Sequence, residues 1–198
     1  MNRALTYTAG VIGLAIGIVA GSAVAQTTAN GPYYATPSWD QQLPAATRFI
    51  VLSNWASAAV LDRETGLVWE KTPEPTPISV NWFNAIEHCS VLNTGGRLGW
   101  RLPTLPELQS LVDISQSNPA LPAGHPFTGV LLVTSSIFGA SFHYYWSATT
   151  VASDATRARR VSFVSGTSAG PFLKDFNSLP GTSMNVWCVR GGAGIDPQ

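Results

Sequence analysis

The spacing of apolar and polar positions changes several times along the chain, and the first changes predict short strands. A continuous apolar run at residues 49–52 is typical of a buried strand. Two similar runs, residues 59–62 and 67–70, flank the polar turn sequence of residues 63–66. The pattern therefore predicts that the folded part of the chain begins with antiparallel strands, the second and third of which form a hairpin.

Beyond a proline-rich connector at residues 72–77, the apolar spacing changes to steps of three and four residues. This spacing places one apolar stripe along a helix, and Ser79 or Asn81 precedes it as a capping residue. We therefore expect a first helix that ends before the two glycines at residues 95–96. The stripe consists of Trp82, Ala85, Ile86, Cys89 and Leu92, so Cys89 is expected to point inward.

A second short helix is predicted soon afterwards, because Thr104 and Glu107 form a capping-box sequence with a proline in the first turn. Residues 114–142 then show no sustained period and contain several prolines and glycines, which predicts a long irregular loop. Loops of that length in compact domains are usually functional. Strands are expected again at residues 144–149, 159–164 and 186–190.

The first 25 residues have the pattern of a cleavable export signal. Arg3 precedes an apolar run at residues 9–20, and small residues follow at the usual distance, which predicts cleavage after Ala25. The alternative is a retained membrane anchor, because the run is nearly long enough to span a bilayer. Residues 26–47 are polar and rich in turn formers, so an extended arm is expected there. The mature protein would be secreted or periplasmic, with no membrane attachment after cleavage.

Composition narrows the class of function. The chain beyond the predicted cleavage site is long enough for one domain with a sizeable core, expected at residues 48–192, and a short tail at residues 193–198. Only 11% of the residues are charged, and 11 basic side chains balance 11 acidic ones. This balance lacks the electrostatic footprint of a nucleic-acid binder, so no nucleic-acid partner is expected.

Cys89 and Cys188 are the only cysteines in the chain. In an oxidising compartment, a pair without a surplus cysteine predicts one disulfide. Such a bond would close a loop of about 100 residues, worth roughly 4 to 5 kcal/mol in the chain-entropy description before strain is subtracted. Two separately buried thiols are the alternative.

Five sequence blocks in order resemble one known family. They are Leu61-Asp62 with residues 65–69, then Trp82, Ala85 and Cys89, then residues 100–104 with Glu107-Leu108, then residues 145–149, and finally residues 188–192. The series is similar to the Lcl C-terminal domain family, named for the terminal domain of a bacterial collagen-like adhesin. The resemblance covers most of the chain beyond the predicted arm.

The resemblance implies an α+β fold of the C-type-lectin-like kind, which is shared by the core of formylglycine-generating enzymes. Such a fold would have two short helices, a small antiparallel sheet and long irregular loops. In it a disulfide joins the first helix to the last strand, and Cys89 and Cys188 stand at those places. The resemblance also implies an adhesin-like role, although the chain contains no collagen-like repeat.

Sequence patterns for catalysis and metal binding are weak. Residues 166–170 match the Gly-x-Ser-x-Gly pattern of a nucleophile elbow, but no histidine follows Ser168, and a glycine- and serine-rich turn is favoured. A formylglycine-generating oxidase would need reactive thiols, which a disulfide would consume. The three histidines lack the spacing of a zinc site, and Asp154 is the only acidic residue at positions 114–156, which argues against calcium. We expect no catalytic residue, metal or cofactor.

The candidate ligand-binding residues lie at the end of the long loop and on the strand after it. Four consecutive aromatic side chains at residues 143–146 offer faces on which a sugar could stack, although core packing of alternate members is the alternative. Two arginines on one face of the following strand add positive charge, while Arg160 points to the other face. A solvated strand edge is the alternative for these arginines. The candidate residues are His143, Tyr144, Tyr145, Trp146, Arg157 and Arg159.

Together these observations favour an exported, non-catalytic binding module that recognises a glycan or another surface partner, such as an extracellular protein. Two other classes stay open. A structural or assembly subunit of an extracellular complex would associate with itself through the polar arm. A hydrolase would need a polar constellation in a cleft. Carbohydrate binding and adhesion are therefore the functions that we test against the structure.

Overall fold

The computed structural model describes residues 43–73, 80–136, 139–176 and 182–191. The predicted export signal, most of the predicted arm and the tail at residues 193–198 lie outside these described residues. Everything described belongs to one compact unit within residues 34–198. Its short helices and largely antiparallel sheets confirm the predicted α+β class.

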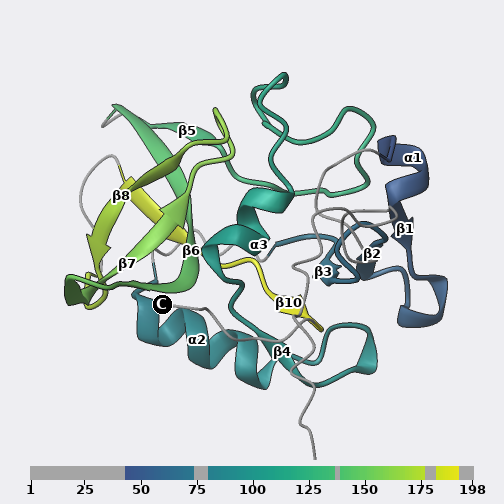
Figure 1. Ribbon diagram of the computed structural model, residues 1–198, viewed down its shortest axis with the longest axis horizontal. Coiled ribbons are helices and arrows are strands. Elements are labelled where there is room, and N and C mark those ends of the chain that lie inside the picture. The colour runs from purple at the N-terminus through teal and green to yellow at the C-terminus, as the bar shows by residue number, and fades with distance from the viewer. Residues whose placement is uncertain (1–42, 74–79, 137–138, 177–181, 192–198) are drawn as a thin grey trace, which may run out of the picture. The chain divides into compact units, whose positions relative to one another are not determined.

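The apolar runs near the start of the described chain form an antiparallel sheet, which we name sheet A. A single helical turn, α1 (Ala45–Arg48), leads into β1 (Phe49–Val51). The predicted hairpin follows as β2 (Ala59–Asp62) and β3 (Val68–Glu70). The end of the chain returns to this sheet, because β10 (Val189–Arg190) pairs with both β3 and β4 (Trp100–Arg101) (Figure 1). Two short 3-10 turns, η1 (Ser53–Trp55) and η2 (Thr94–Gly96), adjoin the sheet.

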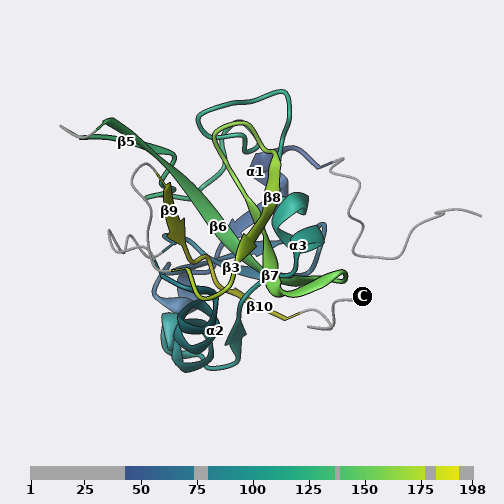
Figure 2. The same ribbon diagram turned by 90° about the vertical axis from the view of Figure 1, so that its left-hand side faces the viewer.

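A second sheet, sheet B, carries the later strands in the order β5-β6-β7-β8. The long strand β6 also pairs in parallel with β9, so sheet B is not purely antiparallel. Figure 2 shows β6 between β9 on one side and β7 on the other. The strands are β5 (Val133–Ser136), β6 (Gly139–Val151), β7 (Asp154–Val161), β8 (Ser168–Leu173) and β9 (Thr182–Asn185).

Three predictions for this half of the chain are wrong in extent. The strand predicted at residues 159–164 is β7, which runs from Asp154 to Val161. The irregular loop ends at residue 132 and not at residue 142, because residues 133–136 and 139–142 pair as strands β5 and β6. This segment has no alternation of apolar and polar residues, so its pairing leaves no period-two signal. The last strand is also shorter than predicted, since only Val189–Arg190 of residues 186–190 is strand.

The two predicted helices are confirmed, and their caps explain where they begin. In α2 (Trp82–Val91), the Asn81 side chain accepts a hydrogen bond from the backbone N–H of Asn84 at 2.8 Å. In α3 (Leu105–Ser110), Thr104 and Glu107 form the expected reciprocal capping box. Among the described residues, neither these helices nor any other has the length and apolar character to cross a membrane.

Two hydrophobic clusters hold the elements together. The first surrounds Trp187, whose ring centroid lies 5.7 Å from that of Trp69, 5.2 Å from that of Phe163 and 5.0 Å from that of Phe127. The second packs α2 against sheet B and includes Cys89. Trp187 and Cys188 are neighbours in sequence but belong to different clusters, so this segment of the chain connects the two.

The predicted disulfide is confirmed. Cys89 on α2 bonds to Cys188 just before β10, with an S–S distance of 2.07 Å and a sequence separation of 99 residues. Both cysteines are fully buried. The bond therefore ties the helix that covers sheet B to the last strand of sheet A.

Sheet A and α3 are also joined by charged groups. Arg48, which is 1% exposed, donates two hydrogen bonds of 2.8 Å to the carboxylate of Asp62 and one of 2.6 Å to the carbonyl of Ser110. Its guanidinium also lies 3.6 Å from the carboxylate of Glu64. We refer to Arg48, Asp62 and Glu64 as the carboxylate network, because each of these buried charges has an opposite charge beside it.

Candidate functional site

The structure places the four predicted aromatic residues on β6, with alternate side chains on opposite faces of sheet B. Tyr145 is 1% exposed and belongs to the cluster around Trp187, and its hydroxyl oxygen accepts a 2.7 Å hydrogen bond from the N–H of Leu131. Trp146 is 0% exposed, and its indole N–H donates to the carbonyl of Val80 at 2.9 Å. The prediction that these two rings stack on a ligand therefore needs correction, because they are part of the core.

The first of the four, His143, is also buried. Its ring nitrogen Nδ1 lies 3.1 Å from the side-chain amide nitrogen of Asn185. Burial lowers the pKa of His143, and the hydrogen bond with Asn185 raises it by a smaller amount. Tyr144 is half-buried and packs on the opposite face from Tyr145. Of the four rings, Tyr144 alone is not fully buried.

The two predicted arginines lie on β7 and do not converge on the aromatic residues of β6. Arg157 forms an ion pair with Asp154 at 3.0 Å, and both side chains are about two-fifths exposed. Hydrogen bonds from Thr156 lower the pKa of the Asp154 carboxyl, with a smaller contribution from Arg157. Arg159 is half-buried, and its carbonyl accepts a hydrogen bond from the Ser147 hydroxyl. The positive charge of Arg157 is thus partly neutralised.

The arginine set aside in the sequence reading, Arg160, has an unusual environment. Its guanidinium carbon lies 3.9 Å from the ring centroid of Tyr144 and 4.0 Å from that of Phe172. One terminal nitrogen lies 3.5 Å from the sulfur of Met184, and Nε is buried without a hydrogen-bond partner. Burial lowers the pKa of Arg160. Within the described part of the chain, no carboxylate forms an ion pair with it.

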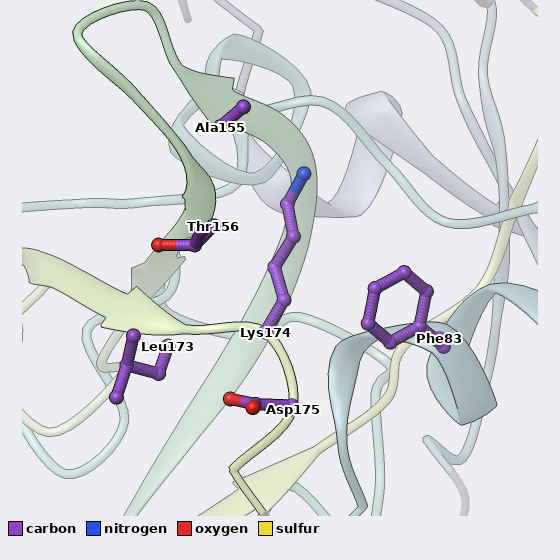
Figure 3. A pocket seen from close by; sticks show the side chains of 6 residues that line it. All are labelled: Phe83, Ala155, Thr156, Leu173, Lys174 and Asp175. Atoms are coloured by element: carbon purple, nitrogen blue, oxygen red, sulfur yellow. The ribbon is translucent and has the colours of Figure 1, made fainter.

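An open cleft of about 490 Å³ lies between α2 and the β7–β8 edge of sheet B. Its walls come from the first turn of α2, the beginning of β7 and the end of β8. Phe83 and Leu173 contribute large apolar side chains that are 56% and 41% exposed. Figure 3 shows the lining residues, which are Phe83, Ala155, Thr156, Leu173, Lys174 and Asp175.

Lys174 supplies the buried charge of this cleft. Its side chain, which is 9% exposed, extends between Phe83 and Thr156 (Figure 3). Its ammonium donates a 2.8 Å hydrogen bond to the hydroxyl of Thr150 and lies 4.0 Å from the ring centroid of Trp82. Burial lowers the pKa of Lys174. No ion pair joins Lys174 to a carboxylate of the described residues.

Neighbouring groups fix the position of this lysine. The backbone N–H of Lys174 donates to the carbonyl of Thr156 at 2.9 Å, and its carbonyl accepts from the N–H of Trp82 at 2.9 Å. The indole N–H of Trp82 in turn donates to the carbonyl of Ser147 at 2.8 Å. The Trp82 ring beneath the ammonium is therefore held through both its backbone and its side chain.

The sequence patterns considered for catalysis and metal binding can be compared with the structure. Ser168 begins strand β8 after a turn, so a strand follows where a nucleophile elbow requires a helix. The hydroxyl of Thr156 already donates to Asp154 at 2.5 Å. Across the described ranges, no group of three or more histidine, cysteine or acidic side chains could hold a metal ion. The cleft offers apolar walls, one ammonium and the exposed carboxylate of Asp175.

Sequence reasoning missed Phe83, Lys174 and Asp175, although one signal was present. The segment Phe172-Leu173-Lys174-Asp175-Phe176 places two charges inside an otherwise apolar block, and the chain has only one other lysine, Lys71. A charged pair in such a block is the kind of local inconsistency that often marks a functional site. The sequence does not show that Phe83 of α2 lines the same cleft as this charged pair, because that placement depends on tertiary structure.

The fold and the cleft define a class, namely an α+β domain with one disulfide between its first long helix and its last strand and an open, partly apolar cleft. Residues 58–190, which are most of the chain, match the Lcl C-terminal domain, and the chain belongs to this family. The comparisons with curated proteins and with solved structures gave no match.

Proposed function

We propose that this domain is a non-catalytic binding module of an exported protein, and that it recognises a glycan or another surface partner at the cleft between α2 and the β7–β8 edge. One observation carries the proposal, which is that two large apolar side chains stay exposed beside a buried lysine that has no carboxylate partner among the described residues. A pocket with apolar walls and a few placed polar groups is the usual form of a ligand site. Membership in the Lcl C-terminal domain family is consistent with such an adhesin-like role.

The composition of the cleft favours a glycan. The exposed ring of Phe83 offers a flat apolar surface, and the less polar face of a sugar ring can pack against it. Asp175 offers carboxylate oxygens that can accept hydrogen bonds from sugar hydroxyls. We infer that the ring holds the sugar and that the polar groups select it.

We also propose that the fold is of the C-type-lectin-like kind. Three features support this proposal: the disulfide between α2 and the last strand, the irregular stretch at residues 114–132, and the two short helices beside the sheets. Export is proposed on the signal-like first 25 residues and on the buried disulfide, which is the kind of bond that persists in oxidising compartments.

A glycan-array screen of the full-length protein and of Phe83→Ala tests the proposed function. Phe83 is 56% exposed, so its replacement should leave the fold intact, and circular dichroism checks this. Val91→Ala is the matched control, because Val91 is 69% exposed on the same helix but does not line the cleft. We expect array signals that Phe83→Ala removes and Val91→Ala keeps. Signals that survive Phe83→Ala unchanged would place the binding surface elsewhere.

A further inference from the structure

Some hydrogen-bond donors of the cleft have no acceptor among the described residues, and this indicates the kind of ligand that the cleft can bind. The ammonium of Lys174 has three N–H donors, and the Thr150 hydroxyl accepts one of them. The ring of Trp82 attracts the charge of the ammonium but does not accept a hydrogen bond of ordinary strength from it. The other two donors have no acceptor among the described residues, so they are available to a ligand.

Two other cations of this protein, one buried and one part-buried, are paired with carboxylates. Arg48 has Asp62 and Glu64 beside it, and Arg101 donates to Glu107 at 2.7 and 2.6 Å. Removing water from a charge is costly unless an opposite charge compensates it. The exposure of Lys174, 9%, lies between that of Arg48, 1%, and that of Arg101, 24%, but Lys174 has no such compensation among the described side chains.

We propose that the cleft binds an acidic sugar residue, whose carboxylate pairs with the ammonium of Lys174 while its ring packs against Phe83. This inference rests on the proposed glycan-binding function and names its ligand class. Hydroxyls of the same sugar donate to Asp175, which is exposed at the cleft. An open cleft of about 490 Å³ has ample room for one such residue.

Two features select a single carboxylate over other anions. A carboxylate is a more basic acceptor than a sulfate ester, so a partly dehydrated ammonium gains more from it. Asp175 adjoins Lys174 at the cleft, and its negative charge opposes a second anionic group on the ligand. A chain of closely spaced sulfates is therefore disfavoured here, although one carboxylate is accepted.

Isothermal titration of the full-length protein with three methyl glycosides tests the inference. The probes are methyl glucuronide, methyl glucoside and a sulfate ester of methyl glucoside. We expect the glucuronide to bind about tenfold more tightly than the glucoside, which is the worth of a hydrogen bond to a charged group. Equal affinities for the glucuronide and the glucoside would overturn the carboxylate inference and leave glycan binding at the cleft intact. A sulfate ester that binds as tightly as the glucuronide would also overturn it.

Two variants test whether the preference for the glucuronide depends on Lys174. Lys174→Met removes the charge but keeps the length of the side chain, so the preference for the glucuronide should vanish. Lys71→Met is the matched control, because Lys71 is the only other lysine of the chain and does not line the cleft. It should keep the preference. A preference that survives in folded Lys174→Met would overturn the inference.

A measurement on the unaltered protein covers the case in which Lys174→Met fails to fold. Reductive methylation of lysines, read by peptide mass spectrometry, reports the accessibility of each amine. Saturating glucuronide should slow the methylation of Lys174 several-fold and leave that of Lys71 unchanged. Unchanged methylation of Lys174 in the presence of bound glucuronide would overturn the inference. A peptide with a free terminal carboxylate that binds and protects Lys174, while no sugar does, would overturn both the sugar assignment and the glycan-binding function.

Discussion

Two regions of this domain bury positive charge in different ways. Between sheet A and α3, the guanidinium of Arg48 is enclosed by Asp62 and Glu64, so cation and carboxylates compensate one another. On the α2 side of sheet B, the cations lie on aromatic rings. Arg160 lies between Tyr144 and Phe172, Lys174 lies over Trp82, and neither has a carboxylate partner in the described chain.

The difference separates charge that fixes the fold from charge that stays available. A carboxylate beside a cation neutralises its charge and leaves little for a ligand to gain. An aromatic ring attracts a cation by about 0.5 to 2 kcal/mol but leaves its N–H donors and its net charge in place. The ring-supported cations of sheet B are therefore positioned but not neutralised.

The largest effect is expected from breaking the carboxylate network. Arg48→Met leaves the carboxylates of Asp62 and Glu64 buried at 0% and 3% exposure without a cation. We expect the free energy of unfolding to fall by about 3 to 5 kcal/mol, as for other buried pairs that lose one partner. Urea denaturation measures it. The control is Arg63→Met, which removes an exposed arginine and should cost less than about 0.5 kcal/mol. A loss below about 1 kcal/mol at Arg48 would contradict the structural role.

The disulfide connects the two regions, because Cys89 lies on α2 and Cys188 adjoins β10 of sheet A. The double substitution Cys89→Ala and Cys188→Ala opens a loop with a sequence separation of 99 residues. We expect a loss of about 2 to 5 kcal/mol in the free energy of unfolding. Hydrogen exchange should show a greater loss of protection in α2 than in the β2–β3 hairpin. Equal loss in both elements would mean that the bond does not act mainly on α2.

A smaller effect is expected at Arg160, despite its depth in the structure. Arg160→Met removes two ring contacts, but it also removes a desolvated charge whose Nε has no hydrogen-bond partner. The two terms oppose each other, so the net change should stay below about 1 kcal/mol. Urea denaturation of Arg160→Met and Arg48→Met under the same conditions compares the two regions directly. A loss as large as that of Arg48→Met would show that aromatic rings compensate a cation as fully as carboxylates do.

Much of the fold could be predicted from local signals. The β2–β3 hairpin, the stripe of α2 and the capping box of Thr104 and Glu107 each rest on residues that are close in sequence. The disulfide was also predictable, because two cysteines allow only one pairing. Strand β5 was not, since its pairing with β6 gives it order that its own sequence does not show.

The candidate site was harder to predict, for a physical reason. Alternation along β6 indicated that Tyr145 and Trp146 point to opposite faces, but sequence does not reveal that both faces of sheet B at this point are covered by core. The cleft needs Phe83 from α2 and Lys174 from the end of β8, which lie far apart in sequence. Only the packing of α2 against sheet B brings them together.

The smallest effect is expected from the titration of Lys174. Burial lowers its pKa in the folded protein below the ordinary value of 10.5, so the folded state disfavours the charged form. Below the folded pKa both states carry the proton, and the penalty is fully present. As the pH rises from the folded pKa towards 10.5, the unfolded chain binds more protons than the folded one, and the free energy of unfolding rises.

Comparison of variants isolates this contribution from other groups that titrate at high pH. Burial also raises the pKa of the Tyr145 hydroxyl, which lowers stability once tyrosine ionises in the unfolded chain, so the unaltered protein alone would give a mixed signal. Lys174→Met keeps the tyrosine contribution and removes that of the lysine. We therefore expect the stability of the unaltered protein, measured relative to Lys174→Met by urea denaturation from pH 7 to 10, to increase with pH, with Lys71→Met as the reference for loss of a lysine elsewhere. A relative stability that falls with pH would mean that a negative group holds the ammonium, and the cation of the cleft would then be compensated like Arg48.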